Sequence, residues 1–333
     1  MKKTLILISI LALLSIAYFG LLKEEEQTSG SISVPDRAFI VDNADLINTI
    51  TIQSIGYPLV HLNKTEGMWI LNGQHRADEH IVQNMVSVLS KMHIHYIPPK
   101  SQNDMINRSI ANTGMQIKTY DKEGSLLTSF IMAGNTNKED GTYCINDGAK
   151  QAYVMSLPMV EGGLRNYFNH ETNALRDKAV FRLDPSNIQS VKIDYPKDRK
   201  NSFEINRIKG KYEFEVSVNT PEQEGTVSDR LMKDYLKDFN FLMAEYVSND
   251  NPAQDSVKGK LPFAIIEISD KIQGALKLEF FPSLDIFDKN VNTQSIDNLG
   301  QVERYFVQTN WNDFFTVQHR LVSKLLKKPD HFY

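Results

Sequence analysis

The chain has very little cysteine: its 333 residues contain only Cys144. A single cysteine cannot form an internal disulfide or a Cys-x-x-Cys motif, and no cysteine follows the N-terminal segment where a lipid anchor would need one. Cys144 lies in the apolar-alternating run 142–145, and no neighbouring histidine or basic residue is present to lower its pKa. We therefore expect a buried strand thiol, in preference to a reactive nucleophile.

Catalytic signatures are also missing. The sequence contains no Gly-x-Ser-x-Gly, Ser-x-x-Lys, Gly-x-x-x-x-Gly-Lys, Gly-x-Gly-x-x-Gly or His-Glu-x-x-His. Aspartates and glutamates are scattered without visible pairing, although an active site assembled from distant residues would leave no such motif. The sequence predicts a protein that is not an enzyme, with no catalytic residues, no cofactor-binding residues and no bound metal.

Excess positive charge is absent as well. Lysine and arginine number 37 against 41 aspartates and glutamates, so the formal net charge is −4. Such a balance gives no electrostatic footprint for nucleic acid. A hydrophobic fraction of 41% over 333 residues is instead typical of a folded chain with room for two domains.

One long hydrophobic run stands out at the beginning of the chain, where residues 4–22 carry no charge. A helix needs about 20 apolar residues to cross a bilayer. Lys2 and Lys3 precede the run and only Lys23 follows before three glutamates, which predicts a cytoplasmic N-terminus and an extracytoplasmic body. We predict a transmembrane signal anchor at 1–22, a flexible tether at 23–37 and a single-pass location in the cytoplasmic (inner) membrane, with the body in the periplasm. Cleavage after Ala17 is the alternative.

The rest of the chain repeats itself. Leu62, Gly67 and Trp69 are matched at a constant offset of 143 residues by a second set with the same character. The second set is Ile205, Gly210 and Tyr212. Segment 39–52 is likewise echoed by 181–193, each reading as a strand, a polar turn and a second strand. We predict a duplication into two α+β lobes, 38–170 and 180–333, joined by a linker at 171–179.

Each lobe is expected to contain antiparallel strands and one main amphipathic helix. Asp78 and Ser228 stand three residues before the apolar stripes that begin at Ile81 and Leu231, and both residue types are preferred N-caps. The spacing predicts helices at 77–92 and 226–239. Strands are predicted at 93–97, 115–120, 125–132, 241–247, 264–268 and 275–281.

Histidines are the best metal candidates. His93 and His95 alternate on a predicted strand and share one face, while His75 and His80 flank Asp78 and Glu79 at a helix start. Zinc needs three or four converging ligands, so a half-exposed strand face and a solvated helix start are favoured. The loop 135–141 has alternating oxygen side chains. Its glycine is one place too late for an EF-hand, and Asn146 occupies the twelfth position where a glutamate is needed, so a polar hairpin loop is favoured.

Three charged clusters remain. Residues 197–200 are expected to form a solvated turn, and 324–328 a helix end. The run Arg176-Asp177-Lys178 lies at the predicted join of the lobes, where ion pairs are expected to fix their angle; contact with a partner is the alternative.

Four stretches together carry a family resemblance: 39–52, 67–69, 134–143, and 176–181 leading into Asp184-Pro185. With these residues the chain resembles the bacterial domain-of-unknown-function 4340 family of membrane-anchored extracytoplasmic proteins. The resemblance supplies no catalytic residues. The association of some members with ABC-type export or gliding-motility machinery implies an accessory component of a membrane complex.

These observations favour a non-enzymatic, membrane-anchored protein that acts as an accessory or scaffold component of an envelope or ABC-transporter/gliding-type complex. The expected partners are the membrane, through the N-terminal helix, and a protein of the envelope complex. An anchored envelope hydrolase and a small-ligand or lipid carrier are the alternatives. A hydrolase would need paired carboxylates in a cleft, and a carrier a large apolar cavity.

Overall fold

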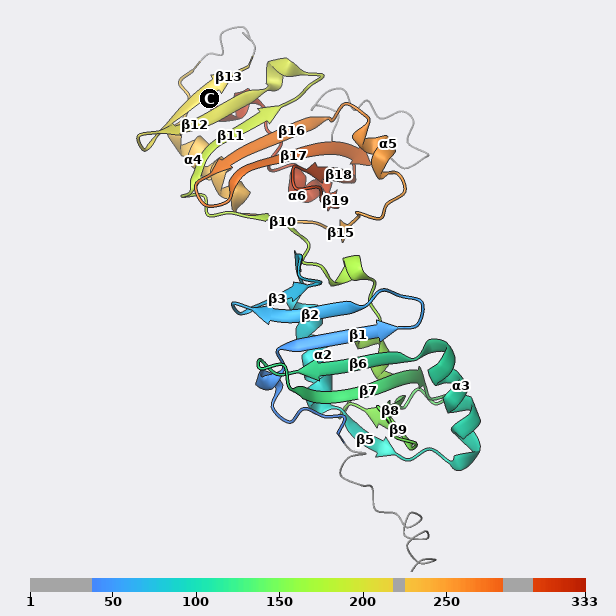
Figure 1. Cartoon of the computed structure of the whole chain (residues 1–333). Coiled ribbons are helices and arrows are strands. Elements are labelled where there is room, and N and C mark those ends of the chain that lie inside the picture. The colour runs from blue at the N-terminus through green and yellow to red at the C-terminus, as the bar shows by residue number, and fades with distance from the viewer. Residues whose placement is uncertain (1–37, 218–224, 284–301) are drawn as a thin grey trace, which may run out of the picture. The chain divides into compact units, whose positions relative to one another are not determined.

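The computed structural model describes residues 38–217, 225–283 and 302–333 (Figure 1). The predicted anchor at 1–22 and the predicted tether at 23–37 lie outside these ranges. Among the described residues no helix is long and apolar enough to span a membrane. The fold is α+β and rich in strands, with two large sheets and few helices.

The first sheet has nine strands in the order β4-β3-β2-β1-β6-β7-β8-β9-β5 (Figure 1). Its strands are β1 Thr49–Ser54, β2 Val60–Thr65, β3 Met68–Leu71, β4 His75–Arg76, β5 His93–Tyr96, β6 Met115–Tyr120, β7 Leu126–Asn135, β8 Thr142–Asn146 and β9 Ala152–Ser156. Neighbours from β6 to β9 are joined as consecutive antiparallel hairpins, and β5 closes the far edge by pairing with β9.

The second sheet has eight strands in the order β13-β12-β11-β16-β17-β18-β19-β15. Its strands are β11 Ile188–Asp194, β12 Phe203–Ile208, β13 Lys211–Val216, β15 Tyr246–Val247, β16 Ala264–Asp270, β17 Gly274–Ser283, β18 Arg304–Thr309 and β19 Phe314–Gln318. A separate antiparallel pair joins β10 Ala179–Arg182 to β14 Phe241–Met243. If the two-residue strand β4 is left aside, the two orders correspond strand for strand, from β3 and β13 at one edge to β5 and β15 at the other.

Five helices lie in the described ranges: α2 Glu79–Lys91, α3 Asn103–Thr113, α4 Asp229–Lys237, α5 Gln254–Lys258 and α6 His319–Val322. The two predicted helices are confirmed as α2 and α4, and each helix begins and ends one to three residues inside its predicted bounds. Their predicted caps are confirmed too, because the Ile81 amide donates to Asp78 Oδ1 at 3.3 Å and the Leu231 amide donates to Ser228 Oγ at 3.4 Å. Helix α3 is an additional element that the repeat pattern did not predict.

Two hairpins carry the same turn. The loop between β2 and β3 is Glu66-Gly67, with φ of 51° and 82°, and the loop between β12 and β13 is Lys209-Gly210, with φ of 49° and 82°. Positive φ at both loop residues is the type I′ geometry that matches the twist of a two-residue hairpin. The strand, glycine turn and strand predicted at both places are confirmed.

Of the two strands predicted within segment 39–52, the second is present as β1, but the first was wrong, because the structure has no strand at residues 39–42. The Val41 amide donates to the Leu89 carbonyl near the end of α2 at 3.0 Å, and the Ala38 carbonyl accepts from the Thr128 hydroxyl. These backbone groups therefore have no need of a neighbouring strand. Phe39 is fully buried, and its ring packs edge-on against Phe130.

Close packing divides the chain into two units. Of the described residues, the first unit combines 38–59 with Val86–Arg165, and the second combines Val60–Met85 with those from Asn166 to Tyr333. The second unit thus holds β2, β3 and β4 together with the whole second sheet. The predicted lobes 38–170 and 180–333 each contain one of the two sheets, so their bounds differ from those of the two units. The division into these lobes stays a prediction.

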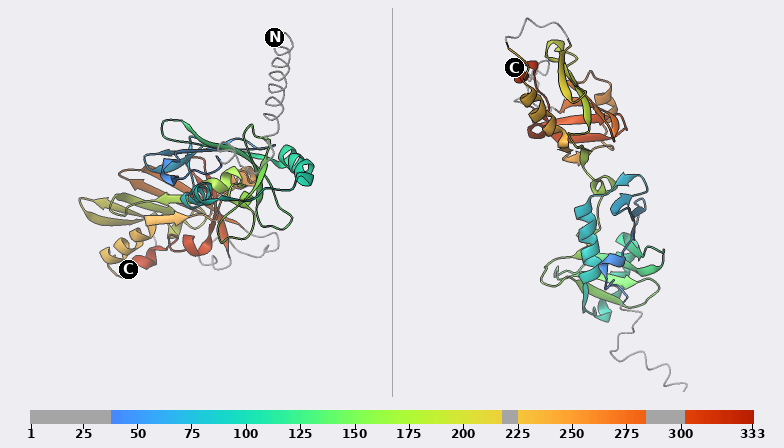
Figure 2. Two further views of the ribbon diagram at one scale, coloured as in Figure 1. Left: turned by 90° about the horizontal axis from the view of Figure 1, so that it is seen from below. Right: turned by 90° about the vertical axis from the view of Figure 1, so that its left-hand side faces the viewer.

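The core of the second unit lies between its sheet and helix α4. Met232, Tyr235 and Leu236 of α4 pack with inward-facing residues of the second sheet, such as Phe203 and Ile205. Figure 2 shows α4, in yellow-orange, along one face of that sheet. A further aromatic ring, Phe332 near the end of the chain, lies 5.1 Å from Phe203 and 5.2 Å from Tyr235, measured between ring centroids.

Candidate functional site

The charged run predicted at the linker is held in place by backbone hydrogen bonds. The short helical turn Thr172–Leu175 precedes it, and the Leu175 carbonyl accepts from the Asp78 amide at 2.8 Å. The Asp177 amide donates to the Arg76 carbonyl at 2.8 Å, and Ala77 and Arg176 form an isolated antiparallel bridge next to β4. All these residues belong to the second unit.

Arg176 makes a buried ion pair. Its Nη2 lies 2.7 Å from Oδ1 of Asp313, and the two side chains are 6% and 13% exposed. Asp313 stands just before β19 and also accepts from Asn249 Nδ2 at 3.0 Å and from Trp311 Nε1 at 3.1 Å. The Arg176 Nε, in contrast, is buried and has no hydrogen-bond partner among the described residues. The carboxylate is therefore well supplied with donors, while the guanidinium keeps an unused one.

Asp177 is the centre of a second network. Both its oxygens accept from Arg182, at 2.5 and 2.9 Å, in the bidentate arrangement that the planar guanidinium favours. The Nε of Arg76 lies 3.5 Å from the same carboxylate, and the Ala179 amide donates to it at 3.1 Å. Asp177 thus joins arginines from β4 and β10.

Both carboxylates are held ionised. Burial is the largest influence on Asp313 and Asp177 and by itself would raise their pKa values. The hydrogen bonds and positive charges of the arginines, with those from Asn249 and the Ala179 amide, outweigh burial and lower both pKa values. Burial and then the Arg176 charge lower the pKa of the nearby His75. At neutral pH the two aspartates are therefore anions, and His75 is neutral.

These side chains line a cavity of about 490 Å³, which we call the arginine cavity. Its charged lining consists of Arg76, Arg176, Arg182, Asp177 and Asp313. The lining also includes neutral residues able to contact a ligand, namely Gln74, His75, Gln273 and Trp311. Three positive and two negative charges leave a net charge of +1. The volume falls within the usual range of ligand sites.

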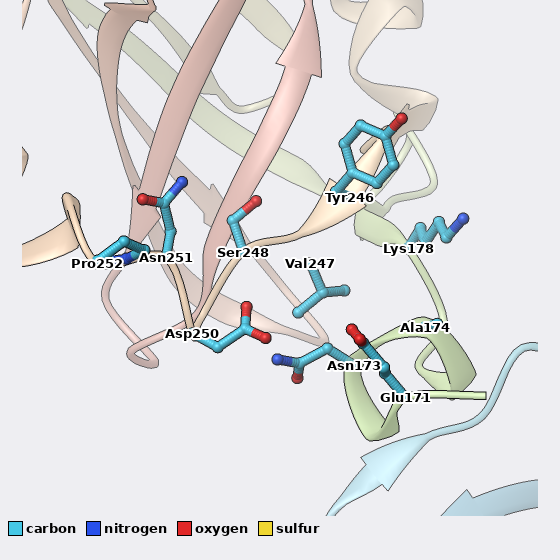
Figure 3. Close-up of a pocket in the computed structure, with 10 residues that line it drawn as sticks. All are labelled: Glu171, Asn173, Ala174, Lys178, Tyr246, Val247, Ser248, Asp250, Asn251 and Pro252. Carbon is cyan, nitrogen blue, oxygen red and sulfur yellow. The ribbon is translucent and has the colours of Figure 1, made fainter. Parts of the chain in front are cut away.

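A second cavity, of about 480 Å³, touches the same chain segment (Figure 3). Lys178 lies beside Tyr246 at one end of it, and Asn173 and Asp250 face one another below Val247. Lys178, which the sequence grouped with Arg176 and Asp177, therefore lines a different cavity from its two neighbours.

The predicted histidine candidates do not converge. His93 and His95 share one face of β5 as predicted and line a third cavity of about 590 Å³, where His93 Nε2 lies 3.3 Å from Ser156 Oγ. His75 lines the arginine cavity, and His80 lies in the first turn of α2. Among the described residues no three His, Cys, Asp or Glu side chains are grouped so as to hold a metal ion.

The other predicted candidates have structural surroundings. Within the loop 135–141, Asp140 accepts hydrogen bonds from the Thr136 hydroxyl at 2.5 Å and the Tyr96 hydroxyl at 3.3 Å, so its carboxylate holds the loop together. Residues 199–201 form a short helical turn, and 324–328 follow α6. Cys144 is confirmed as a buried thiol on β8, and burial raises its pKa.

Sequence reasoning missed most of the arginine cavity. It singled out Arg176 and Asp177, and His75 as a metal candidate, but gave no weight to Arg76, Arg182 or Asp313. Arg176 and Asp313 are 137 residues apart in the chain, and no motif links them. The only available signal was the placement of opposite charges in a predicted linker.

Comparison with known proteins adds one finding. Neither the curated proteins nor the solved structures gave a match to this chain. A family model described as a domain of unknown function, DUF4340, matches residues 69–259. The match covers more than half of the chain and includes Arg76, Arg176, Asp177 and Arg182, though not Asp313. The chain belongs to the DUF4340 family.

Proposed function

We propose that this protein is a non-enzymatic, single-pass membrane protein whose extracytoplasmic body binds a protein partner through the arginine cavity. In this role it is an accessory or scaffold component of an envelope complex. The apolar run at residues 4–22 supports the anchor, and the resemblance of the chain to membrane-anchored proteins supports the setting.

One observation carries the choice of binding over catalysis: both aspartates in the arginine cavity are committed to ion pairs with arginines. A carboxyl group that acts as a general acid at neutral pH needs a raised pKa, whereas the pKa values of Asp177 and Asp313 are lowered. The groups left to meet a ligand are N–H donors of arginine side chains. Arginine is enriched at protein interfaces, where its guanidinium forms ion pairs and hydrogen bonds with the partner.

We also propose that the two sheets arose by duplication. The strand order of the first sheet from β3 to β5 corresponds to that of the second from β13 to β15. In each copy one capped helix, α2 or α4, follows the hairpin with the glycine turn. The Glu66-Gly67 and Lys209-Gly210 turns have φ values within 2° of one another. If the two sheets were alike by chance, there would be no reason for the corresponding hairpins to have the same type I′ turn. The arginine cavity, in contrast, draws on unlike parts of the two copies, so it is a feature that the duplication itself does not supply.

Site-specific photo-cross-linking in native membranes tests the binding function. A photoreactive residue replaces Gln74, which is exposed and lines the arginine cavity, in the full-length chain. The control replaces Lys122, an exposed turn residue that lines none of the three cavities. We expect an adduct of defined mass from position 74 only, and its loss when residues 1–22 are deleted. Equal adducts from both positions, or none from position 74, would refute the proposal.

A further inference from the structure

We propose that the arginine cavity binds a carboxylate group on a peptide segment of the partner. This inference rests on the proposed function for the identity of the ligand as a protein, and on the cavity itself for the carboxylate. Four features of the cavity point to this ligand: an unused buried donor, an unbalanced charge, two accessible guanidinium groups and a neutral wall suited to a peptide.

The unused donor belongs to Arg176. A guanidinium has five N–H donors, and within the described part of the chain this side chain makes a single hydrogen bond, to Asp313. Its Nε is buried without an acceptor among the described residues. A buried polar group without a partner is costly, so such a group in a native structure calls for an explanation. An oxygen acceptor that enters the cavity beside Arg176 would supply one if the guanidinium turns, because the Nε itself is buried.

The charge balance indicates a monoanion. Three arginines face two aspartates, and His75 adds no charge because burial and Arg176 lower its pKa. The cavity is therefore positive by one unit on a chain whose formal net charge is −4. One carboxylate neutralises the excess, whereas a phosphate dianion would reverse it. Like-charge repulsion from Asp177 and Asp313 would then oppose the second negative charge.

The two outer arginines are available to a ligand. The side chains of Arg76 and Arg182 are 44% and 46% exposed, although both contact Asp177. Among the described residues, the Arg76 side chain has one polar contact, 3.5 Å from Nε to Asp177, so its remaining N–H groups are able to turn toward an incoming oxygen. Arginine forms bidentate hydrogen bonds with carboxylates, which gives the contact direction as well as charge.

The neutral lining favours a peptide over a small free anion. Gln74 is exposed and offers an amide that is able to pair with a peptide backbone. Trp311 is 39% exposed and presents an aromatic surface to the same cavity. Amide hydrogen bonds and aromatic contact area are what a peptide uses when its side chain is anchored by charge. A bare anion would leave both unused.

The chain provides its own reporter for a binding test. It has only two tryptophans, and Trp69 is 2% exposed, while Trp311 lines the cavity and donates its indole N–H to Asp313. The test is to label the full-length chain with ¹⁵N at tryptophan and to follow the two indole N–H signals by NMR. The probes are the acetylated, amidated tripeptide Ala-Glu-Ala, its Ala-Gln-Ala analogue, acetyl-Ala-Ala with a free terminal carboxylate, and inorganic phosphate.

We expect Ala-Glu-Ala to shift the Trp311 signal saturably, and Ala-Gln-Ala to cause no shift at the same concentration. Comparison with acetyl-Ala-Ala separates an acidic side chain from a chain terminus as the source of the carboxylate. Arg76→Gln should weaken binding about 10-fold, the usual effect of losing a hydrogen bond to a charged group. Arg207→Gln is the matched control, because Arg207 is on β12, lies over Tyr212 and lines none of the cavities. It should leave binding unchanged.

Equal shifts with Ala-Glu-Ala and Ala-Gln-Ala, no shift with any carboxylate, or tighter binding of phosphate than of carboxylate would overturn this inference. The outcome is separable from that of the proposed function. If position 74 captures a partner equally well in the Arg76→Gln variant, the carboxylate assignment fails while partner binding stands. If carboxylate peptides bind and no partner is captured, the carboxylate assignment stands while partner binding in the membrane fails.

Discussion

Breaking the Arg176–Asp313 ion pair is the most severe test of how the arginine cavity is built. The side chains are 6% and 13% exposed, so solvent screens the pair little. Asp313→Asn removes the negative charge and keeps the shape, leaving a buried guanidinium without its counter-ion. Arg176→Met removes the positive charge and leaves a buried carboxylate. Removing one partner of a buried pair costs about 3–5 kcal/mol of unfolding free energy.

The double variant decides whether the pair is a unit. In Arg176→Met/Asp313→Asn neither charge is left alone, so its cost should be at least about 2 kcal/mol below the sum of the two single costs. Urea unfolding of the full-length chain in detergent, followed by circular dichroism, measures all four proteins of the cycle. Additive costs, or single costs below about 1 kcal/mol, would show that the ion pair does not hold this part of the fold together and would refute the reasoning.

The same cycle has a pH signature. The hydrogen bonds and charge around Asp313 lower its pKa in the folded protein, against the opposing effect of burial. A lowered folded pKa gives stability that is fully present above the unfolded value of about 3.9 and is lost as pH falls through the folded value. The stability difference between the native chain and Asp313→Asn should therefore be constant near neutral pH and shrink below about pH 4. A difference that grows with acidity would contradict the assigned direction.

Three further outcomes are expected from other parts of the fold. Tyr235→Phe should cost about 1 kcal/mol of unfolding free energy, because the buried hydroxyl donates to the Leu325 carbonyl at 2.7 Å; a neutral result in urea unfolding would contradict this. Cys144 should not react with a thiol reagent in the folded chain and should react fully in urea, since burial raises its pKa; rapid labelling of the folded chain would be inconsistent with its place on β8. Glu66→Asn should stabilise the chain by up to about 1 kcal/mol, because asparagine adopts the positive φ of this turn more readily than glutamate; a loss of stability would argue against the type I′ turn.

Local features of the fold were predictable because the signals that specify them are local. Asp78 and Ser228 cap α2 and α4 through side-chain oxygens that accept from amides three residues on. Both partners of this interaction are therefore close together in the sequence. Gly67 and Gly210 likewise mark two-residue hairpins because few other residues adopt a φ of 82°. The strand order of each sheet was not predicted, because β1 pairs with β6 and β5 with β9 across long stretches of chain that no local signal connects.

Features that depend on distant partners were not predictable. Residues 39–42 have a strand-like pattern, but the Val41 amide finds its acceptor at the end of α2. Helix α3 has few apolar positions, and its fully buried residue Ile106 packs in a cluster with Ala133 and Val154, so tertiary contacts outweigh a weak local pattern. The partner of Arg176 lies 137 residues away, where nothing in the local sequence of Asp313 marks it.

Stability and ligand binding should separate cleanly between two arginines of the same cavity. Arg76→Gln and Arg176→Met each remove one positive charge and bring the cavity from +1 to zero. Both variants should therefore lose most of the attraction for a carboxylate peptide. Their effects on folding should differ, because the Arg76 side chain is 44% exposed at a 3.5 Å contact and such pairs contribute about 0–1 kcal/mol, whereas Arg176 is buried against Asp313.

The comparison therefore distinguishes two explanations of a binding defect. If charge draws the ligand, Arg76→Gln binds poorly while its urea midpoint stays close to that of the native chain. If binding depends only on an intact fold, Arg76→Gln binds normally and only Arg176→Met fails. The arginine cavity was assigned on charge and unused donors, so the second result would remove the basis of that assignment.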